Sequence, residues 1–128
     1  MPKVVIRSDK APAPVAAYSQ AIRAGDFLFL SGQIPLDPET HQLVSGGIES
    51  ETRRVLDNLA AVLEAGGATF ADVVKMTVYL ADMQDFAAFN AVYVSYFPEQ
   101  PPARATVAVL GLPRGVRVEI DAIAYLAR

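Results

Sequence analysis

The sequence predicts an α+β fold in which two helices cover one face of a mixed sheet of about six strands. Two observations carry this prediction. Apolar residues recur at helical spacing over residues 48–64, and a shorter aromatic stripe follows Asp85. Apolar and charged residues alternate over residues 116–126, which is typical of a half-buried strand. The 128 residues suit a single domain over 1–128, in which elements follow as hairpin, helix, strand, helix and two strands.

Short apolar runs separated by turn residues predict the other strands. Residues 21–24 and 27–31 flank Gly25-Asp26, which is typical of a tight hairpin turn. Further strands are expected over 3–7, 72–81 and 103–110. Pro101 and Pro102 precede the last of these strands, because proline cannot donate a hydrogen bond within a central strand.

The two helices are predicted from their apolar stripes and their ends. The first should run from Ile48 to Glu64, where Gly66-Gly67 stops it. The second should begin at Asp82 and Asp85, which resemble a capping box. Its stripe consists of Phe86, Phe89, Tyr93 and Phe97, with Pro98 beyond its end. Asn90 lies in the same stripe, either as a surface-edge residue or with its amide pointed into a pocket.

The face of the sheet opposite the helices has no element to cover it. Residues 73–80 and 103–110 are apolar on both sides, and two helices can cover only one face. Burial against other copies of the same chain is the simplest solution. The sequence therefore predicts an oligomer.

Composition excludes several classes of function. The net charge of −3 and the absence of a basic run argue against nucleic-acid binding. No cysteine is present, so thiol chemistry and disulfides are excluded. The one histidine, His41, is expected to face solvent in a polar turn. Carboxylate metal sites remain possible. Neither a signal peptide nor a membrane span is apparent, so a cytoplasmic protein is expected.

Arg104 is the one charged residue in the strand expected over 103–110. A guanidinium among apolar groups needs an anion, because an unpaired buried charge is costly. That anion is either a carboxylate elsewhere in the fold or a ligand held by the fork of the guanidinium. Other polar residues also stand in apolar surroundings, namely Tyr18, Ser31, Asn90, Thr106 and Glu119. Together they would make a small anion-recognising pocket with a candidate base.

Several short motifs, in their order and spacing, make the chain similar to the Rid family (reactive intermediate deaminases, also called the YjgF family). They are Tyr18-Ser19-Gln20-Ala21, Ser31-Gly32-Gln33-Ile34-Pro35, Leu56-Asp57-Asn58-Leu59, Lys75-Met76-Thr77-Val78-Tyr79-Leu80, Asp85-Phe86 with Asn90, Pro102-Ala103-Arg104, and Leu112-Pro113 before Val118-Glu119-Ile120. The resemblance covers nearly the whole chain. It implies a chorismate-mutase-like fold, a homotrimer with pockets at the subunit interfaces, and no metal or organic cofactor.

The activity that the resemblance implies is hydrolysis of small 2-imino acids, such as 2-iminopropanoate and 2-iminobutanoate, to 2-oxo acids and ammonia. Arg104 would clamp the substrate carboxylate, and Glu119 would hold and polarise the attacking water. The expected substrate-binding residues are Tyr18, Ser31, Gly32, Asn90, Arg104 and Thr106. For Glu119 the alternative is a structural ion pair with Arg104.

Two departures from the family pattern concern the same strand. Thr106 stands where many members carry cysteine, and Leu110 stands where they carry a smaller residue.

The alternative function is a non-catalytic or regulatory trimer that binds a small carboxylate. Some family-like proteins lack the arginine and are not imine deaminases. The presence of Arg104 together with Glu119, Tyr18 and Ser31 therefore favours the enzyme.

Overall fold

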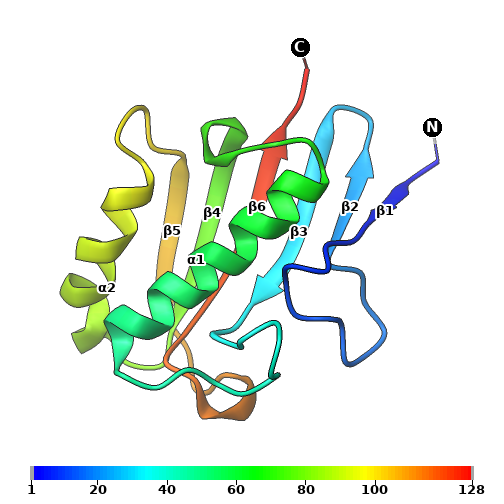
Figure 1. The fold of residues 1–128 in the computed structure, drawn as a ribbon. Coiled ribbons are helices and arrows are strands. Elements are labelled where there is room, and N and C mark those ends of the chain that lie inside the picture. The colour runs from blue at the N-terminus through cyan, green and yellow to red at the C-terminus, as the bar shows by residue number, and fades with distance from the viewer. Residues whose placement is uncertain (1, 128) are drawn as a thin grey trace.

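The computed structural model describes residues 2–127, and its strands form one sheet in the order β1-β2-β3-β6-β4-β5 (Figure 1). The strands are β1 (Val4–Ile6), β2 (Ala21–Ala24), β3 (Phe27–Gln33), β4 (Val73–Leu80), β5 (Ala103–Ala108) and β6 (Val118–Tyr125). All neighbouring strands are antiparallel except β4 and β5, which run parallel. The predicted mixed six-stranded sheet is confirmed.

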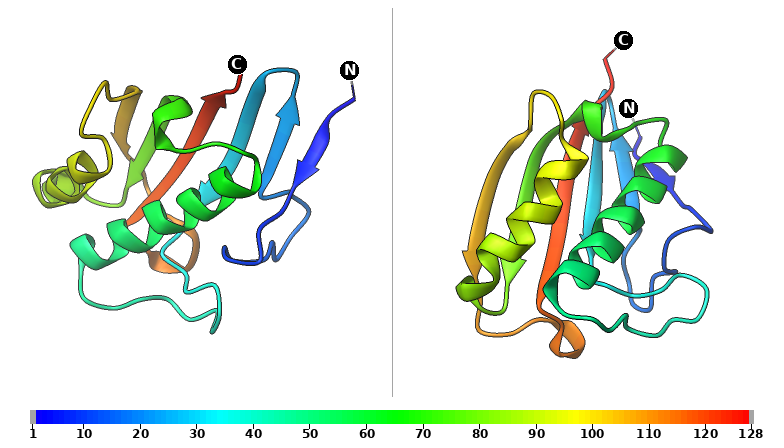
Figure 2. Two further views of the ribbon diagram at one scale, coloured as in Figure 1. Left: turned by 45° about the horizontal axis from the view of Figure 1, so that its top comes forward. Right: turned by 60° about the vertical axis from the view of Figure 1, so that its left-hand side comes forward.

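Two helices, α1 (Ile48–Ala65) and α2 (Phe86–Tyr93), lie on the same face of this sheet (Figure 2). The stripe of α1 supplies most of the contact with the sheet, and its central members are fully buried: Val55, Leu56, Leu59, Val62 and Leu63. Helix α2 is the crossover between β4 and β5, which a parallel pair of strands requires. This crossover sets β5 at one edge of the sheet.

Helix α2 is shorter than the sequence predicts. The α-helix ends at Tyr93, and a 3-10 turn over Val94–Tyr96 follows. The Ser95 hydroxyl donates a hydrogen bond to the Val92 carbonyl, which accompanies the tightening of the chain before Pro98. The aromatic stripe nevertheless continues, because the rings of Tyr93 and Phe97 pack with centroids 4.8 Å apart.

The start of α2 also differs from the prediction. The Asp82 side chain accepts a hydrogen bond from Gln84 N and so caps a 3-10 turn over Met83–Asp85, which precedes the α-helix.

The strands expected over 72–81, 103–110 and 116–126 are each shorter than predicted. Asp72 lies in a 3-10 turn before β4, where it completes a capping box with Thr69.

The face opposite the helices exposes large apolar side chains. Phe27, Phe29, Val107 and Tyr125 are each 41–45 % exposed, whereas Leu28, between the two phenylalanines, is fully buried against the helices. The rings of Phe27 and Tyr125 pack across β3 and β6 with centroids 5.1 Å apart. The uncovered apolar face that the sequence predicts is therefore present.

A buried glutamine holds the loop between β1 and β2. Gln20 is 2 % exposed, and its Nε2 donates to the carbonyls of Ser8 and Pro12, at 3.1 and 2.8 Å. Its Oε1 accepts a hydrogen bond from Ser8 N at 2.6 Å. One side chain thus closes a loop that has no secondary structure of its own and that carries Tyr18.

We expect Gln20→Ala to lower the free energy of unfolding by about 2–3 kcal/mol, because it leaves buried backbone groups without partners. The exposed Gln42 provides a matched control, and Gln42→Ala should change stability by less than about 0.5 kcal/mol. Urea unfolding followed by circular dichroism measures both values. Equal midpoints for the two variants would contradict the role given to Gln20.

Candidate functional site

Four of the seven predicted site residues line one hollow. It has a volume of about 420 Å³, and its lining residues come from the end of β3, the loop before β2, the turn before β6 and the start of β6. Its lining consists of Val15, Tyr18, Ser31, Gly32, Ile34, Pro113, Arg114 and Glu119. Tyr18, Ser31, Gly32 and Glu119 are thus brought together from three separate parts of the chain.

A β-bulge shapes the wall of this hollow. Leu30 pairs with Ala122 and Gln33 pairs with Ile120, so β3 carries one residue more than β6 between these pairs. The Glu119 carboxyl lies directly over the Cα atom of Gly32. A Cβ atom built on Gly32 would overlap Glu119 Oε2 and would lie 3.0 Å from its Cδ atom. Glycine is therefore required at position 32 for the carboxyl to occupy this place.

Hydrogen bonds fix the neighbouring groups. The Ser31 hydroxyl donates to the carbonyl of Ser19 at 2.6 Å, and Ser31 N donates to the carbonyl of Gln20 at 3.0 Å. These bonds tie the bulge to the loop that carries Tyr18. Tyr18 itself is 48 % exposed, so its ring stands at the opening of the hollow.

The environment of Glu119 favours its protonated form. Burial raises the pKa of its carboxyl, and the negative charge of Asp121 on the same strand raises it further. Asp121 accepts a hydrogen bond of 3.0 Å from the Tyr79 hydroxyl, and this bond raises the pKa of Tyr79. Glu119 can therefore accept and return a proton closer to neutrality than an ordinary glutamate.

The other three predicted residues lie together around Arg104 on the helix-covered face. Arg104 Nη1 donates a hydrogen bond of 2.8 Å to Asn90 Oδ1. The guanidinium carbon lies 4.7, 5.5 and 5.9 Å from the ring centroids of Tyr93, Phe86 and Phe89, within the range of cation–π attraction. The amide of the half-buried Asn90 thus points toward Arg104.

Two hydroxyls of this cluster lack partners. Among residues 2–127, Thr106 Oγ1 and Tyr93 Oη are buried and have no hydrogen-bond partner of acceptable geometry. Burial raises the pKa of Tyr93, and the positive charge of Arg104 opposes this rise. A buried hydroxyl without a partner is uncommon and calls for a ligand, a water or another chain.

The two groups are on opposite faces of the sheet. Arg104 pairs with Met76, which is fully buried under the helices, so Arg104 extends to the helix side. Glu119 precedes the fully buried Ile120 and therefore extends to the other side. Among residues 2–127, no carboxylate forms an ion pair with Arg104. The structural pair between Arg104 and Glu119 that the sequence left open does not form within one chain.

Arg114, which was not among the residues predicted for the site, also lines the hollow. The backbone of Arg114 has φ 57° and ψ 18°, inside a 3-10 turn over Pro113–Gly115. This left-handed conformation turns the chain back toward β3. The tripeptide Pro-Arg-Gly before a strand was the available signal, because a long basic residue between two turn residues has no packing role there.

The part of the chain that the structure describes contains neither a metal-binding cluster nor a membrane-spanning helix. No group of three or more His, Asp or Glu side chains within residues 2–127 could hold a metal ion. None of its helices combines the length and the apolar character that crossing a membrane requires.

Comparison with known proteins shows what the chain resembles. The family model described as endoribonuclease L-PSP matches residues 8–126. A RutC family protein of Pyrococcus horikoshii is 55 % identical over 123 residues, which cover 96 % of this chain and 98 % of the relative. A Mus musculus protein named 2-iminobutanoate/2-iminopropanoate deaminase is 50 % identical over 120 residues, 94 % and 89 % of the two chains.

A solved structure agrees with these matches. The crystal structure of RidA from an Antarctic Psychrobacter species superposes with a TM-score of 0.93 at 45 % identity, over 96 % of this chain and 99 % of that one. The α+β fold described above is thus the fold of that protein. With the family model matching nearly the whole chain, the protein belongs to the Rid (YjgF) family, whose model bears the description endoribonuclease L-PSP.

Proposed function

We propose that the protein hydrolyses small 2-imino acids, such as 2-iminopropanoate and 2-iminobutanoate, to 2-oxo acids and ammonia. The observation that carries the proposal is the presence of two complementary half-sites. One offers the Arg104 cation, which forms no ion pair with a carboxylate of residues 2–127, and the other offers the Glu119 carboxyl, whose pKa is raised and which lies over Gly32. The mouse relative, which is 50 % identical over 120 residues, is named for this activity.

Arg104 and Glu119 extend to opposite faces of the sheet within one chain, so a shared site requires a second copy of the chain. Strand β5 is an edge strand of six residues with Arg104 as its one charge, and such an edge readily pairs with another chain. The exposed aromatic side chains of β3 and β6 also favour burial of this face against further copies. We infer a homotrimer in which Asn90, Arg104 and Thr106 of one copy face Tyr18, Ser31, Gly32 and Glu119 of the next.

The chemistry of the reaction suits these residues. The carboxylate of a 2-imino acid would accept two parallel hydrogen bonds from the Arg104 guanidinium, which Asn90 orients. Water then adds to the imine carbon, and Glu119 takes one proton from the water as the C–O bond forms. Glu119 returns this proton to the nitrogen, which gives a carbinolamine. The proton of the new hydroxyl group then passes to the amino nitrogen, again through Glu119, and ammonia leaves as the C=O bond forms. Holding carbon and water in contact supplies a large part of the rate.

The remaining residues of the site would position substrate and water. Ser31 and Tyr18 present hydroxyls at the hollow, and Gly32 leaves its backbone accessible beside the Glu119 carboxyl. Thr106 would offer its partnerless hydroxyl to the substrate or the neighbouring copy. A threonine cannot be oxidised as a cysteine can, so this variant of the family site would be insensitive to thiol reagents.

The first test removes the Arg104 guanidinium, which would bind the substrate carboxylate. We expect Arg104→Ala to lower kcat/KM at least about 100-fold, and Arg104→Lys to restore little, because an ammonium cannot bind a carboxylate bidentately. An amino-acid oxidase generates 2-iminopropanoate in situ, and semicarbazide traps the imine that escapes hydrolysis. Arg53→Ala, an exposed arginine of α1, serves as the control.

Light scattering on the same samples verifies that each variant keeps its assembly. Full activity of a correctly assembled Arg104→Ala variant would overturn the proposal. Absence of turnover by the wild-type oligomer, with 2-oxo acids still bound in calorimetry, would instead support the non-catalytic carboxylate-binding trimer.

The second test concerns the carboxyl. We expect Glu119→Gln to lower kcat about 100-fold while 2-oxo acid affinity changes little, since the amide cannot take a proton. The rate should fall as pH falls through the raised pKa of Glu119. Asp121→Asn removes the neighbouring negative charge and should shift this acidic limb to lower pH, whereas the exposed Asp26→Asn should not.

Near neutral pH, Glu119→Gln should raise the stability of the folded protein although it lowers activity. A carboxyl whose pKa is raised in the folded state binds its proton more tightly there than in the unfolded state. Glu119 therefore lowers stability as pH rises above the ordinary glutamate pKa. Glu119→Gln should then melt at a higher temperature near neutral pH, and this gain should vanish in acid. An unshifted acidic limb in Asp121→Asn, or a lower melting temperature for Glu119→Gln at neutral pH, would contradict this account.

A further inference from the structure

A second, smaller hollow lies next to the first. It has a volume of about 130 Å³ and shares five wall residues with the larger one, namely Val15, Tyr18, Gly32, Ile34 and Arg114. Its far wall comes from the loop before β2 and from the segment that follows β3, including Leu36 and His41. The two hollows are therefore adjacent, and Tyr18 lines both.

The charges in this second hollow have one sign. Its charged or imidazole-bearing lining residues are His41 and Arg114, and no carboxylate lines it. Glu119 borders only the larger hollow. A ligand with two anionic groups would thus be repelled at the Glu119 end and attracted at the other.

Both basic residues reach the hollow from unusual backbone conformations. Arg114 has φ 57° and His41 has φ 59°, and only one other non-glycine residue of 2–127 has a positive φ, Gln100. A left-handed backbone conformation is unfavourable for an arginine, because its Cβ atom approaches the following carbonyl oxygen. Histidine tolerates this region better, so the His41 turn is less informative than the Arg114 turn.

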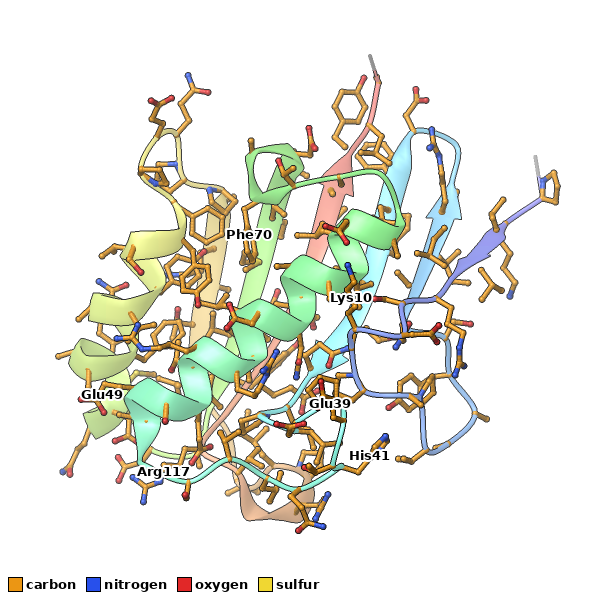
Figure 3. All side chains as sticks on the ribbon, viewed as in Figure 1. Lys10, Glu39, His41, Glu49, Phe70 and Arg117 are labelled. Atoms are coloured by element: carbon orange, nitrogen blue, oxygen red, sulfur yellow. The ribbon has the colours of Figure 1, made fainter. Side chains whose placement is uncertain are left out.

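The side chains of the two residues remain available to a ligand. Within the described residues, neither side chain makes an ion pair or a hydrogen bond. Figure 3 shows His41 extending from the segment between β3 and α1 toward the loop that precedes β2. The backbone N–H of His41 donates to the carbonyl of Asp37 at 2.9 Å, which fixes the turn that presents the imidazole.

We propose that the second hollow is a subsite for an anionic group at the far end of the substrate, so that dicarboxylic 2-imino acids are substrates. The inference rests on the proposed function. The carboxylate next to the imine would bind Arg104 of a neighbouring copy. The distal carboxylate would lie between His41 and Arg114, whose N–H groups donate to its oxygens.

The test compares two imines on the same enzyme. L-Glutamate oxidase generates the five-carbon dicarboxylic imine from glutamate, and an L-amino-acid oxidase generates 2-iminobutanoate from 2-aminobutanoate. We expect Arg114→Gln to lower kcat/KM for the dicarboxylic imine about tenfold relative to 2-iminobutanoate, and Arg114→Lys to restore most of this ratio. His41→Ala should lower the same ratio by a smaller factor.

Arg53→Gln controls for the loss of one positive charge far from the hollows and should leave the ratio unchanged. A ratio that Arg114→Gln leaves unchanged, or a wild type that hydrolyses only 2-iminobutanoate, would overturn the subsite while the deaminase proposal stands. Hydrolysis of neither imine would overturn the deaminase proposal itself.

In that last case calorimetry with 2-oxoglutarate and 2-oxobutanoate decides on the subsite alone. Weaker binding of 2-oxoglutarate to Arg114→Gln, with 2-oxobutanoate binding unchanged, would support it. Equal effects of the substitution on the two ligands would overturn it.

Discussion

The placement of Arg104 under helix α2 is the constraint on which the candidate site depends. Three aromatic rings and the Asn90 amide hold the guanidinium on the helix side of the edge strand β5. The guanidinium of Arg104 could reach Glu119 of the same chain only by passing through the packed sheet. The cation and the carboxyl are therefore available to a shared ligand only if two copies of the chain contribute one each.

The Glu119 half of the site depends on backbone geometry more than on side-chain packing. The bulge in β3 gives room for one extra residue, Gly32 removes the Cβ atom that would displace the carboxyl, and Gln20 closes the loop that carries Tyr18. Burial beside Asp121 then raises the pKa of Glu119. The fold thus holds this carboxyl in a conformation and a protonation range that suit proton transfer, at some expense in stability at neutral pH.

Most of the fold could be predicted from the sequence, because apolar spacing reports directly which face of a helix or strand is buried. The stripe of α1 and the alternation of β6 are such cases. The end of α2 could not, because the aromatic stripe runs on to Phe97 although the backbone tightens after Tyr93. The separation of Arg104 from Glu119 depends on the strand order β6-β4-β5, which spacing does not encode. Arg114 was missed because its role follows from a loop packing against a distant strand end.

The measurement that tests the shared site most directly mixes two inactive subunits. Arg104→Ala and Glu119→Gln chains are unfolded together, refolded at equal concentration and assayed for imine hydrolysis. If each site takes Arg104 from one copy and Glu119 from the next, random assembly leaves about a quarter of the sites intact, with a matching share of wild-type activity. Activity no higher than the mean of the two separate variants would contradict a site shared between copies.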